Sequence, residues 1–169
     1  REYERTVVTA FDAYVKPVVE KYLVHLENEL NQAGVSSEPK IMQSRGGMSA
    51  VSIARQRPVR LFLSGQAAGV VGAATVGKAV EVDDLISVDI GGTSSDIALI
   101  SGGRPTLRSE GEIEGFPVRV NMVDVNSIGA GGGSLAWLDT AGGLRVGPGS
   151  AGADPGPACY GRGGKEPTV

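Results

Sequence analysis

The chain has 169 residues, which is enough for one hydrophobic core or for slightly more than one domain. Its 41% hydrophobic and 21% charged residues are typical of a soluble globular protein. The net charge of -3 argues against nucleic acid as the main partner, because surfaces that bind nucleic acids are usually basic. A small phosphate ligand is not excluded, since backbone amides can hold an anion without net positive charge.

Glycine is the unusual component, with 26 residues in the chain. The share expected from average composition is about 7%. Most of these glycines follow Ser87 and lie between apolar segments. This clustering predicts tight turns and close approach of the backbone to a ligand rather than disorder.

The cysteine count and the absence of targeting segments bear on where in the cell the protein is expected. Cys159 is the only cysteine, so no internal disulfide can form, which fits a reducing environment. No stretch resembles a signal peptide, and no apolar run is long enough to span a membrane. We therefore expect a cytoplasmic protein with no membrane partner. The chain starts without Met and stops at Val169 without a natural ending, so we expect an internal fragment of a longer protein.

The N-terminal segment predicts one long amphipathic helix. Pro17 is expected to kink this helix or to begin a second one, and Gly34 is expected to end it. His25 is interpreted as a packed or surface residue rather than a base. The apolar residues recur at the three-four spacing of one buried stripe: Val7, Val8, Phe11, Tyr14, Val15, Val18, Val19, Tyr22, Leu23, Leu26 and Leu30.

Short strands and a second helix are predicted next. Lys40–Gln43 is expected to form a strand that ends in a turn at Gly46-Gly47, and Val59–Leu63 is expected to form another strand. The hydroxyl of Ser64 is expected to cap a helix over Gln66–Ala79. That helix consists almost wholly of Ala, Gly and Val, which favours tight packing against a sheet or another backbone.

Consecutive strands with short turns follow. Leu85–Ile90 is predicted to be a buried strand, with Ile97–Ile100 as its partner. Gly102-Gly103 is the next turn, followed by strands at Thr106–Arg108 and Val118–Met122. The short connections predict an antiparallel start to a mixed sheet. From Gly129 onward regular structure is expected to thin out, and residues 142–164 are expected to form an ordered loop or a tail.

The segment between the first two of these strands carries a pattern that indicates phosphate chemistry. Asp89 follows a buried strand, where a carboxylate can hold Mg²⁺ or its waters, and Asp96 can accept from a Mg²⁺-bound water. Gly91 and Gly92 allow a sharp turn that aims amides at an anion. Thr93 adds a hydroxyl donor. We count the neighbouring Ser94 among the predicted ligand-binding residues, with Asp89 and Asp96 as the catalytic and metal-organising pair.

The alternative is a tight hairpin that needs glycine only for its turn. The two aspartates and the threonine favour the phosphate interpretation. The segment differs from a P-loop, which ends in Gly-Lys-Ser/Thr before a helix. It also differs from the dinucleotide fingerprint, which opens a helix rather than a second strand.

The segment Asp89–Asp96 resembles the phosphate loop of the actin, sugar kinase and heat-shock-70 ATPase superfamily. The Ala/Gly helix before it is similar to the helix that connects the two lobes there. Four further motifs resemble the hydantoinase A/5-oxoprolinase family: Arg45–Met48, Leu63–Val70, Ser127–Ser134 and Gly147–Gly161. In two positions the chain departs from this family, which usually has Pro at Gln66 and often Gly at Ala68.

This resemblance implies an α/β fold of the ribonuclease-H-like kind, with a mixed sheet, flanking helices and two lobes. It implies ATP and Mg²⁺ as cofactors, and a hydantoinase B-like second subunit as partner. Residues 1–83 would then hold the interlobe helix, and residues 84–169 would form part of the phosphate lobe. The family's first phosphate loop has no counterpart in this chain, so we expect half of a cleft.

A glycine run is the second candidate site. The residues Gly131, Gly132, Gly133 and Ser134 follow the phosphate hairpin, as an adenosine-contacting loop does in the superfamily. The alternative is a flexible connection before a strand.

Other candidates are weaker. The loop Asp154–Gly161 resembles a substrate loop, but Cys159 has no histidine nearby in sequence and is interpreted as structural. Arg45 and Arg60 could face a phosphate, although arginines beside turns are usually solvated.

Three functions are consistent with these patterns. The first is an ATP-dependent hydrolase that opens a cyclic amide, either hydantoin or 5-oxoproline, by phosphoryl activation. The second is a subunit of an acetone or acetophenone carboxylase. The third is a nucleotide-driven conformational module without small-molecule chemistry. The isolated fragment is expected to be inactive in each case.

Overall fold

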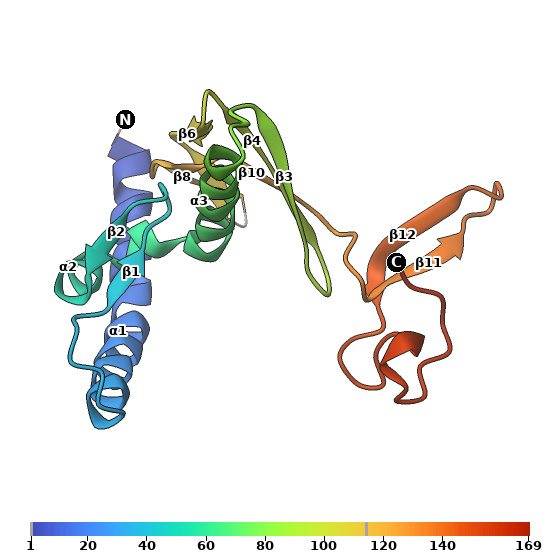
Figure 1. Cartoon of the computed structure of the whole chain (residues 1–169), viewed down its shortest axis with the longest axis horizontal. Helices are drawn as coiled ribbons and strands as arrows, with labels where there is room; N and C mark the ends of the chain where they lie inside the picture. The colour runs from blue at the N-terminus through green and yellow to red at the C-terminus, as the bar shows by residue number, and fades with distance from the viewer. Residues whose placement is uncertain (1, 114) are drawn as a thin grey trace. The chain divides into compact units, whose positions relative to one another are not determined.

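The computed structural model describes residues 2–113 and 115–169 as a mixed α/β arrangement (Figure 1). Two compact units are present: unit 1 comprises Arg1–Asp84 and Ile100–Asp124, and unit 2 comprises Leu85–Leu99 and Val125–Val169. Residues 100–124 thus pack with the N-terminal part of the chain. The division into lobes at residues 83 and 84 stays a prediction.

Unit 1 begins with the predicted long helix, α1 (Glu2–Gln32). The predicted buried stripe is wrong for much of its length, because Leu23 is buried whereas Tyr14, Val18 and Tyr22 are exposed. Pro17 lies inside this single helix, so the expectation of a second helix starting there is wrong. The amide of Val35 donates to the carbonyl of Leu30, and Gly34 has a φ of +79°. Gly34 therefore ends the helix as predicted, because glycine adopts this left-handed conformation without steric cost. None of the helices in the described residues is both long enough and apolar enough to cross a membrane.

The core of unit 1 forms where α1 meets the next elements. These are β1 (Lys40–Met42), β2 (Met48–Ala50) and α2 (Val51–Gln56), with β1 and β2 paired antiparallel. The buried side chains of Leu23, Val51 and Ala54 form the centre of the cluster. Partly buried apolar residues surround them: Val19, Leu26, Ile41 and Leu61.

The strand predicted at residues 59–63 is wrong, because this segment forms the 3-10 helix η1 (Pro58–Leu61). Pro58 occupies the first turn, where its fixed φ suits a helix and its missing amide costs nothing. The carboxylate of Asp12 on α1 accepts a hydrogen bond of 2.9 Å from the amide of Val59. This contact with α1 satisfies an amide that a strand would have paired with a neighbour.

The Ala/Gly helix α3 (Ser64–Ala79) begins two residues earlier than predicted. Leu63 precedes it in the left-handed conformation, and no side chain caps the first turn, so the predicted Ser64 cap is wrong. Ala67, Val70 and Gly77 are its buried residues, and the others are half-buried or exposed. The expected close packing therefore holds for one face of the helix and not for its whole surface.

The remaining strands of unit 1 are short. They are β5 (Arg104–Pro105), β6 (Leu107–Arg108), β7 (Gly111–Ile113), β8 (Phe116–Val118) and β9 (Met122–Val123). β6 pairs with β9, and β7 pairs with β8. The single strand predicted over Val118–Met122 is wrong, because its apolar ends belong to β8 and β9, which have different partners. Val118, at the end of β8, and Met122, at the start of β9, are both fully buried. The apolar positions of the predicted strand therefore mark the buried ends of two separate strands.

Unit 2 contains the hairpin of β3 (Leu85–Ile90) and β4 (Ser95–Ser101), with β10 (Val125–Ile128) on the other side of β4. The last two residues of β4 belong to unit 1 and pair with β5. Both predicted strands are confirmed, but the expected burial of β3 is wrong. Ile86, Val88 and Ile90 are 66%, 56% and 62% exposed.

A second hairpin occupies the region where regular structure was expected to thin out. It consists of β11 (Ser134–Leu138) and β12 (Leu144–Ser150), and the short helix η2 (Ala158–Tyr160) follows. β12 was not predicted because it contains glycine and proline, which are both uncommon within strands. The indole nitrogen of Trp137 donates to the carbonyl of Gly147 at 2.7 Å and ties the two strands together.

Asp139 closes this second hairpin. Its carboxylate accepts from the side chain of Arg145 and the amide of Gly143, both at 2.8 Å, and from the amide of Ala141 at 3.0 Å. The Arg145 contact, followed by the Gly143 amide, lowers the pKa of Asp139. A carboxyl whose folded pKa is lowered stabilises the fold above its unfolded pKa, and this contribution is lost as pH falls through the folded pKa.

We therefore expect Asp139→Asn, which mimics the protonated carboxyl, to speed amide exchange in residues 134–150 at neutral pH. Hydrogen-exchange mass spectrometry of the full-length protein measures this. Asp154→Asn, at an exposed aspartate, is the matched control and leaves these peptides unchanged. Equal exchange in the parent and Asp139→Asn would contradict the role of Asp139.

Candidate functional site

The loop between β3 and β4 presents backbone amides that no protein group uses. The amide of Gly91 donates to the carbonyl of Ser94 at 2.9 Å and closes the loop. Within the described part of the chain, the amides of Gly92, Thr93 and Ser94 and the hydroxyl of Thr93 have no hydrogen-bond acceptor. Gly91, Gly92 and Thr93 are exposed. Successive free amides in an exposed loop have the chemistry of an anion-binding site.

The glycine run predicted as a second site lies directly against this loop. The amide of Gly132 donates to the carbonyl of Gly91 at 2.9 Å, and the amide of Gly133 donates to that of Gly92 at 2.6 Å. In a trans peptide the carbonyl points opposite to the amide of the following residue. The amides of Gly92 and Thr93 therefore point away from the glycine run. The glycine run therefore contacts the carbonyl side of the loop, and the amides of Gly92 and Thr93 lie on the opposite side.

Contact this close requires glycine. A Cβ at Gly131 would lie 2.6 Å from the nitrogen of Ser94 and 2.7 Å from the carbonyl oxygen of Gly91. A Cβ at Gly133 would lie 2.9 Å from the carbonyl oxygen of Gly92. All these neighbours are backbone atoms, which cannot rotate away. The two glycines thus allow one backbone to pack on another.

Ser134 completes the support. Its side chain is buried, and its hydroxyl oxygen accepts from the amide of Gly131 at 3.0 Å. The same hydroxyl lies 3.4 Å from the carbonyl oxygens of Thr93 and Gly129. The Ser134 hydroxyl thus contacts both the glycine run and the loop between β3 and β4. The expectation that Gly131, Gly132, Gly133 and Ser134 contact a base or ribose stays a prediction.

The two aspartates lie on the strands that flank the loop. Gly91 pairs with Ser94 at the loop, and the hydroxyl of Ser87 donates to the carbonyl of Ala98 at 3.4 Å. Both contacts fit one register, and in that register Asp89 lies opposite Asp96. Directly opposed residues of antiparallel strands point to the same face. We infer that the two carboxylates share one face of the hairpin.

Ser127 is a site neighbour that the sequence interpretation missed. It lies opposite Asp96 in the pairing of β10 with β4, and its hydroxyl donates to the Asp96 carboxylate. Ser95 is another, because its buried hydroxyl donates to the carbonyl of Ala130. Both serines lie within motifs identified in the sequence, but nothing in those motifs indicates which group each hydroxyl contacts. Their roles follow from the pairing of strands that are far apart in sequence.

The described residues contain no cluster of three or more His, Cys, Asp or Glu side chains that could enclose a metal ion. Mg²⁺ does not require one, since it keeps several waters and binds through one or two carboxylates and substrate phosphates. Asp89 is exposed and Asp96 is half-buried, so both can reach such waters. The donor set of this hairpin therefore fits a magnesium-bound phosphate chain.

The other candidates from the sequence lie elsewhere. Cys159 is an exposed free thiol on η2. His25 is exposed on α1, in unit 1, which agrees with a surface role. The substrate-loop interpretation of residues 154–161 stays a prediction.

The chain is similar to a family of larger enzymes. The model of the hydantoinase/oxoprolinase family matches residues 5–169. The crystal structure of ATP-dependent caprolactamase from Pseudomonas jessenii superposes with a TM-score of 0.84 at 41% identity, covering 100% of this chain and 24% of that one. The acetophenone carboxylase gamma subunit of Aromatoleum aromaticum is 36% identical over 99% of this chain and 23% of its own length. Arabidopsis thaliana 5-oxoprolinase 1 is 36% identical over 98% of this chain and 13% of its own length.

The chain thus spans about a quarter or less of the length of these proteins.

We expect Gly131→Ala to displace the loop between β3 and β4, because the new methyl group would overlap three backbone atoms. Forced overpacking of this kind costs about 1–3 kcal/mol. Thermal unfolding of the full-length protein measures the loss, and hydrogen exchange over residues 89–96 localises it.

Gly129→Ala is the matched control. A Cβ at Gly129 meets nothing within 4 Å, so this variant keeps the parent's stability and exchange. A Gly131→Ala protein that behaved like Gly129→Ala would show that the glycine run does not support the loop.

Proposed function

Because the chain belongs to the hydantoinase/oxoprolinase family, we propose that it is one part of an ATP-dependent enzyme that opens a cyclic amide such as a hydantoin or 5-oxoproline. The observation that carries this proposal is the set of free amides at Gly92, Thr93 and Ser94 beside the two aspartates. The similarity to ATP-dependent caprolactamase supports the same reaction class.

We assign this part of the enzyme to the ribonuclease-H-like fold of actin-like ATPases. The order of elements supports the assignment: the Ala/Gly helix α3 is followed by the β3–β4 hairpin with its glycine loop. In this arrangement residues 1–83 close one lobe and residues 84–169 begin the other. The first phosphate loop of the superfamily would come from another part of the longer protein.

Each residue of the hairpin has a role in this proposal. The amides of Gly92 and Thr93 and the Thr93 hydroxyl hold phosphate oxygens. Because these donors are already in place, they need little reorganisation when negative charge develops on the phosphate oxygens in the transition state. The carboxylates of Asp89 and Asp96 hold waters of Mg²⁺, and the Ser127 hydroxyl keeps Asp96 oriented. Phosphoryl transfer depends mainly on such positioning and charge neutralisation.

ATP would transfer its terminal phosphoryl group to the lactam oxygen and leave as ADP. Water would then attack the activated carbon, and release of phosphate together with cleavage of the ring C–N bond would complete the hydrolysis. The substrate pocket and a second, hydantoinase B-like subunit belong to the complete enzyme. Similar proteins named as subunits of larger enzymes support such a partner.

A ketone carboxylase subunit is the second candidate. The similarity to the acetophenone carboxylase gamma subunit, at 36% identity over 99% of this chain, favours it. The same hairpin serves either reaction, since both rely on phosphoryl transfer. A conformational module without small-molecule chemistry has no comparable support.

We expect Asp89→Asn to lower ATP turnover of the full-length enzyme by on the order of 100-fold or more, because a preorganised charge that acts at the phosphate is lost. Steady-state phosphate release measures this, and calorimetry with Mg-ATP separates binding from turnover. Asp83→Asn, at an exposed aspartate just before β3, is the matched control and keeps full turnover. Unchanged turnover in Asp89→Asn would refute the role of Asp89.

The substrate class is tested by measuring ATP hydrolysis with three additions: hydantoin, 5-oxoproline, and acetophenone with bicarbonate. We expect a cyclic amide to stimulate turnover, and product analysis to show the opened ring. If only acetophenone with bicarbonate stimulated turnover, the proposal of a carboxylase would replace that of a cyclic-amide hydrolase. ATP hydrolysis that no addition changes would favour the conformational module.

A further inference from the structure

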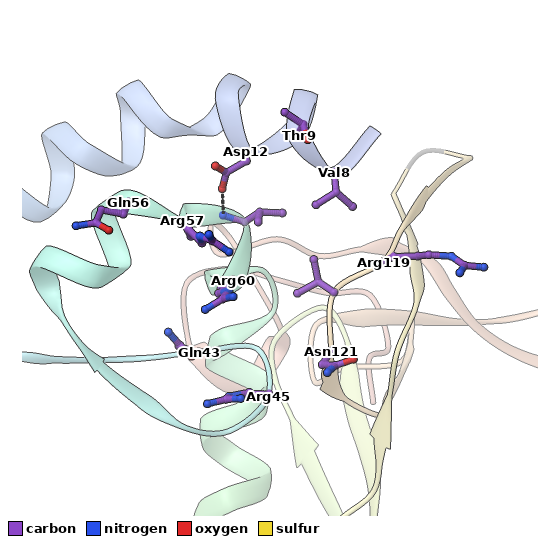
Figure 2. A pocket seen from close by; sticks show the side chains of 12 residues that line it. Val8, Thr9, Asp12, Gln43, Arg45, Gln56, Arg57, Arg60, Arg119 and Asn121 are labelled. Atoms are coloured by element: carbon purple, nitrogen blue, oxygen red, sulfur yellow. Dashed lines mark hydrogen bonds between the residues drawn. The ribbon is translucent and has the colours of Figure 1, made fainter. Parts of the chain in front are cut away.

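Unit 1 contains a pocket of about 520 Å³ that lies outside the hairpin described above (Figure 2). Its walls come from α1, from the turn after β1, from the end of α2 and η1 with the residue between them, and from the segment between β8 and β9. This volume lies within the range of about 300–1,000 Å³ that small-molecule sites occupy.

The pocket is strongly basic although the chain carries a net charge of -3. Four of the chain's 16 lysines and arginines line it, against one acidic residue, Asp12. The Asp12 carboxylate already accepts from the Val59 amide, as the dashed line in Figure 2 marks. This hydrogen bond positions the carboxylate, whose single negative charge offsets only one of the four guanidinium charges.

The four arginines differ in their pairing. Arg119 forms ion pairs with Glu110 at 3.2 Å and with Glu4 at 3.7 Å, and Figure 2 shows its side chain extending away from Arg57 and Arg60. Arg45, Arg57 and Arg60 have neither an ion-pair partner nor a side-chain hydrogen bond among the residues that the structure describes. All three side chains are exposed, so their guanidinium groups are accessible to an anion that enters from solvent.

The backbone that carries these arginines is held in place. Ser44 is 2% exposed, and both its amide and its hydroxyl donate to the carbonyl of Arg60, at 2.7 Å and 2.6 Å. The carbonyl of Ser44 accepts from the amide of Val123 at 2.8 Å. One buried residue thus joins the turn that bears Arg45, the 3-10 helix that bears Arg60, and the segment that follows Asn121. A preorganised arrangement reduces the entropy lost on binding.

We propose that this pocket binds a small molecule that carries at least two carboxylate or phosphate groups. A guanidinium group donates two parallel hydrogen bonds to either kind of oxyanion, and three such groups can accept more than one. Figure 2 shows Arg57, Arg60 and Arg45 in succession along one wall, with Asn121 across from them. Amide side chains at Gln43 and Asn121 add neutral donors and acceptors. The proposal does not rest on the ATP chemistry of unit 2, because residues of unit 1 alone line the pocket.

The test is isothermal titration calorimetry of the full-length protein with succinate, with pyrophosphate and with acetate as a single-charge comparison. Arg57→Gln and Arg60→Gln are each expected to weaken the binding of succinate or pyrophosphate by roughly 10-fold or more, as expected for loss of a charged hydrogen-bond partner. Hydrogen exchange is expected to slow in residues 43–47 and 57–61 when the same ligand is added.

Arg104→Gln is the matched control, because it removes the same charge from an exposed arginine outside the pocket. It leaves both affinities unchanged. Loss of succinate binding alone in the pocket variants assigns the site to carboxylates, and loss of pyrophosphate binding alone assigns it to phosphates. The proposal is overturned if neither probe binds more tightly than acetate, or if Arg104→Gln weakens binding as much as the pocket variants do.

Discussion

Two backbone hydrogen bonds, from Gly132 to Gly91 and from Gly133 to Gly92, determine which way the loop between β3 and β4 faces. They occupy the carbonyls of the loop, and peptide planarity then directs the amides of Gly92 and Thr93 to the opposite side. The outward direction of the free donors depends on this orientation, whereas the positions of the aspartates and of Ser127 follow from the pairing of β4 with its two neighbours. The glycine run is required for it, because any Cβ at Gly131 or Gly133 would displace the loop.

Unit 1 is organised around a different kind of contact, in which polar groups join segments that are far apart in sequence. Asp12 on α1 binds the amide of Val59, and Ser44 binds the carbonyl of Arg60. Arg55 on α2 reaches back to Glu20 on α1 at 2.9 Å. These links hold η1 against α1 over a modest apolar cluster. They also set the positions of the arginines that give this unit its basic pocket.

Several elements could be predicted from the sequence because their signals are local. The three-four spacing of apolar residues and the glycine at position 34 are sufficient for α1 and its end. The β3–β4 hairpin follows from two apolar runs joined by Gly91 and Gly92. The predictions that were wrong involve segments whose conformation depends on a distant partner. Residues 58–61 became a 3-10 helix where Asp12 meets Val59, and residues 118–122 divided between two strands with different neighbours.

The sequence by itself determined that residues 89–96 form a glycine hairpin flanked by two carboxylates, since both the turn and the strands are specified by adjacent residues. It did not determine that residues 131–134 support this loop from behind, that Ser127 binds Asp96, or that three unpaired arginines line one pocket. Those features required the tertiary structure. Hydrogen bonds between strands and the approach of one backbone to another depend on distances in space, which a local pattern of residues does not encode.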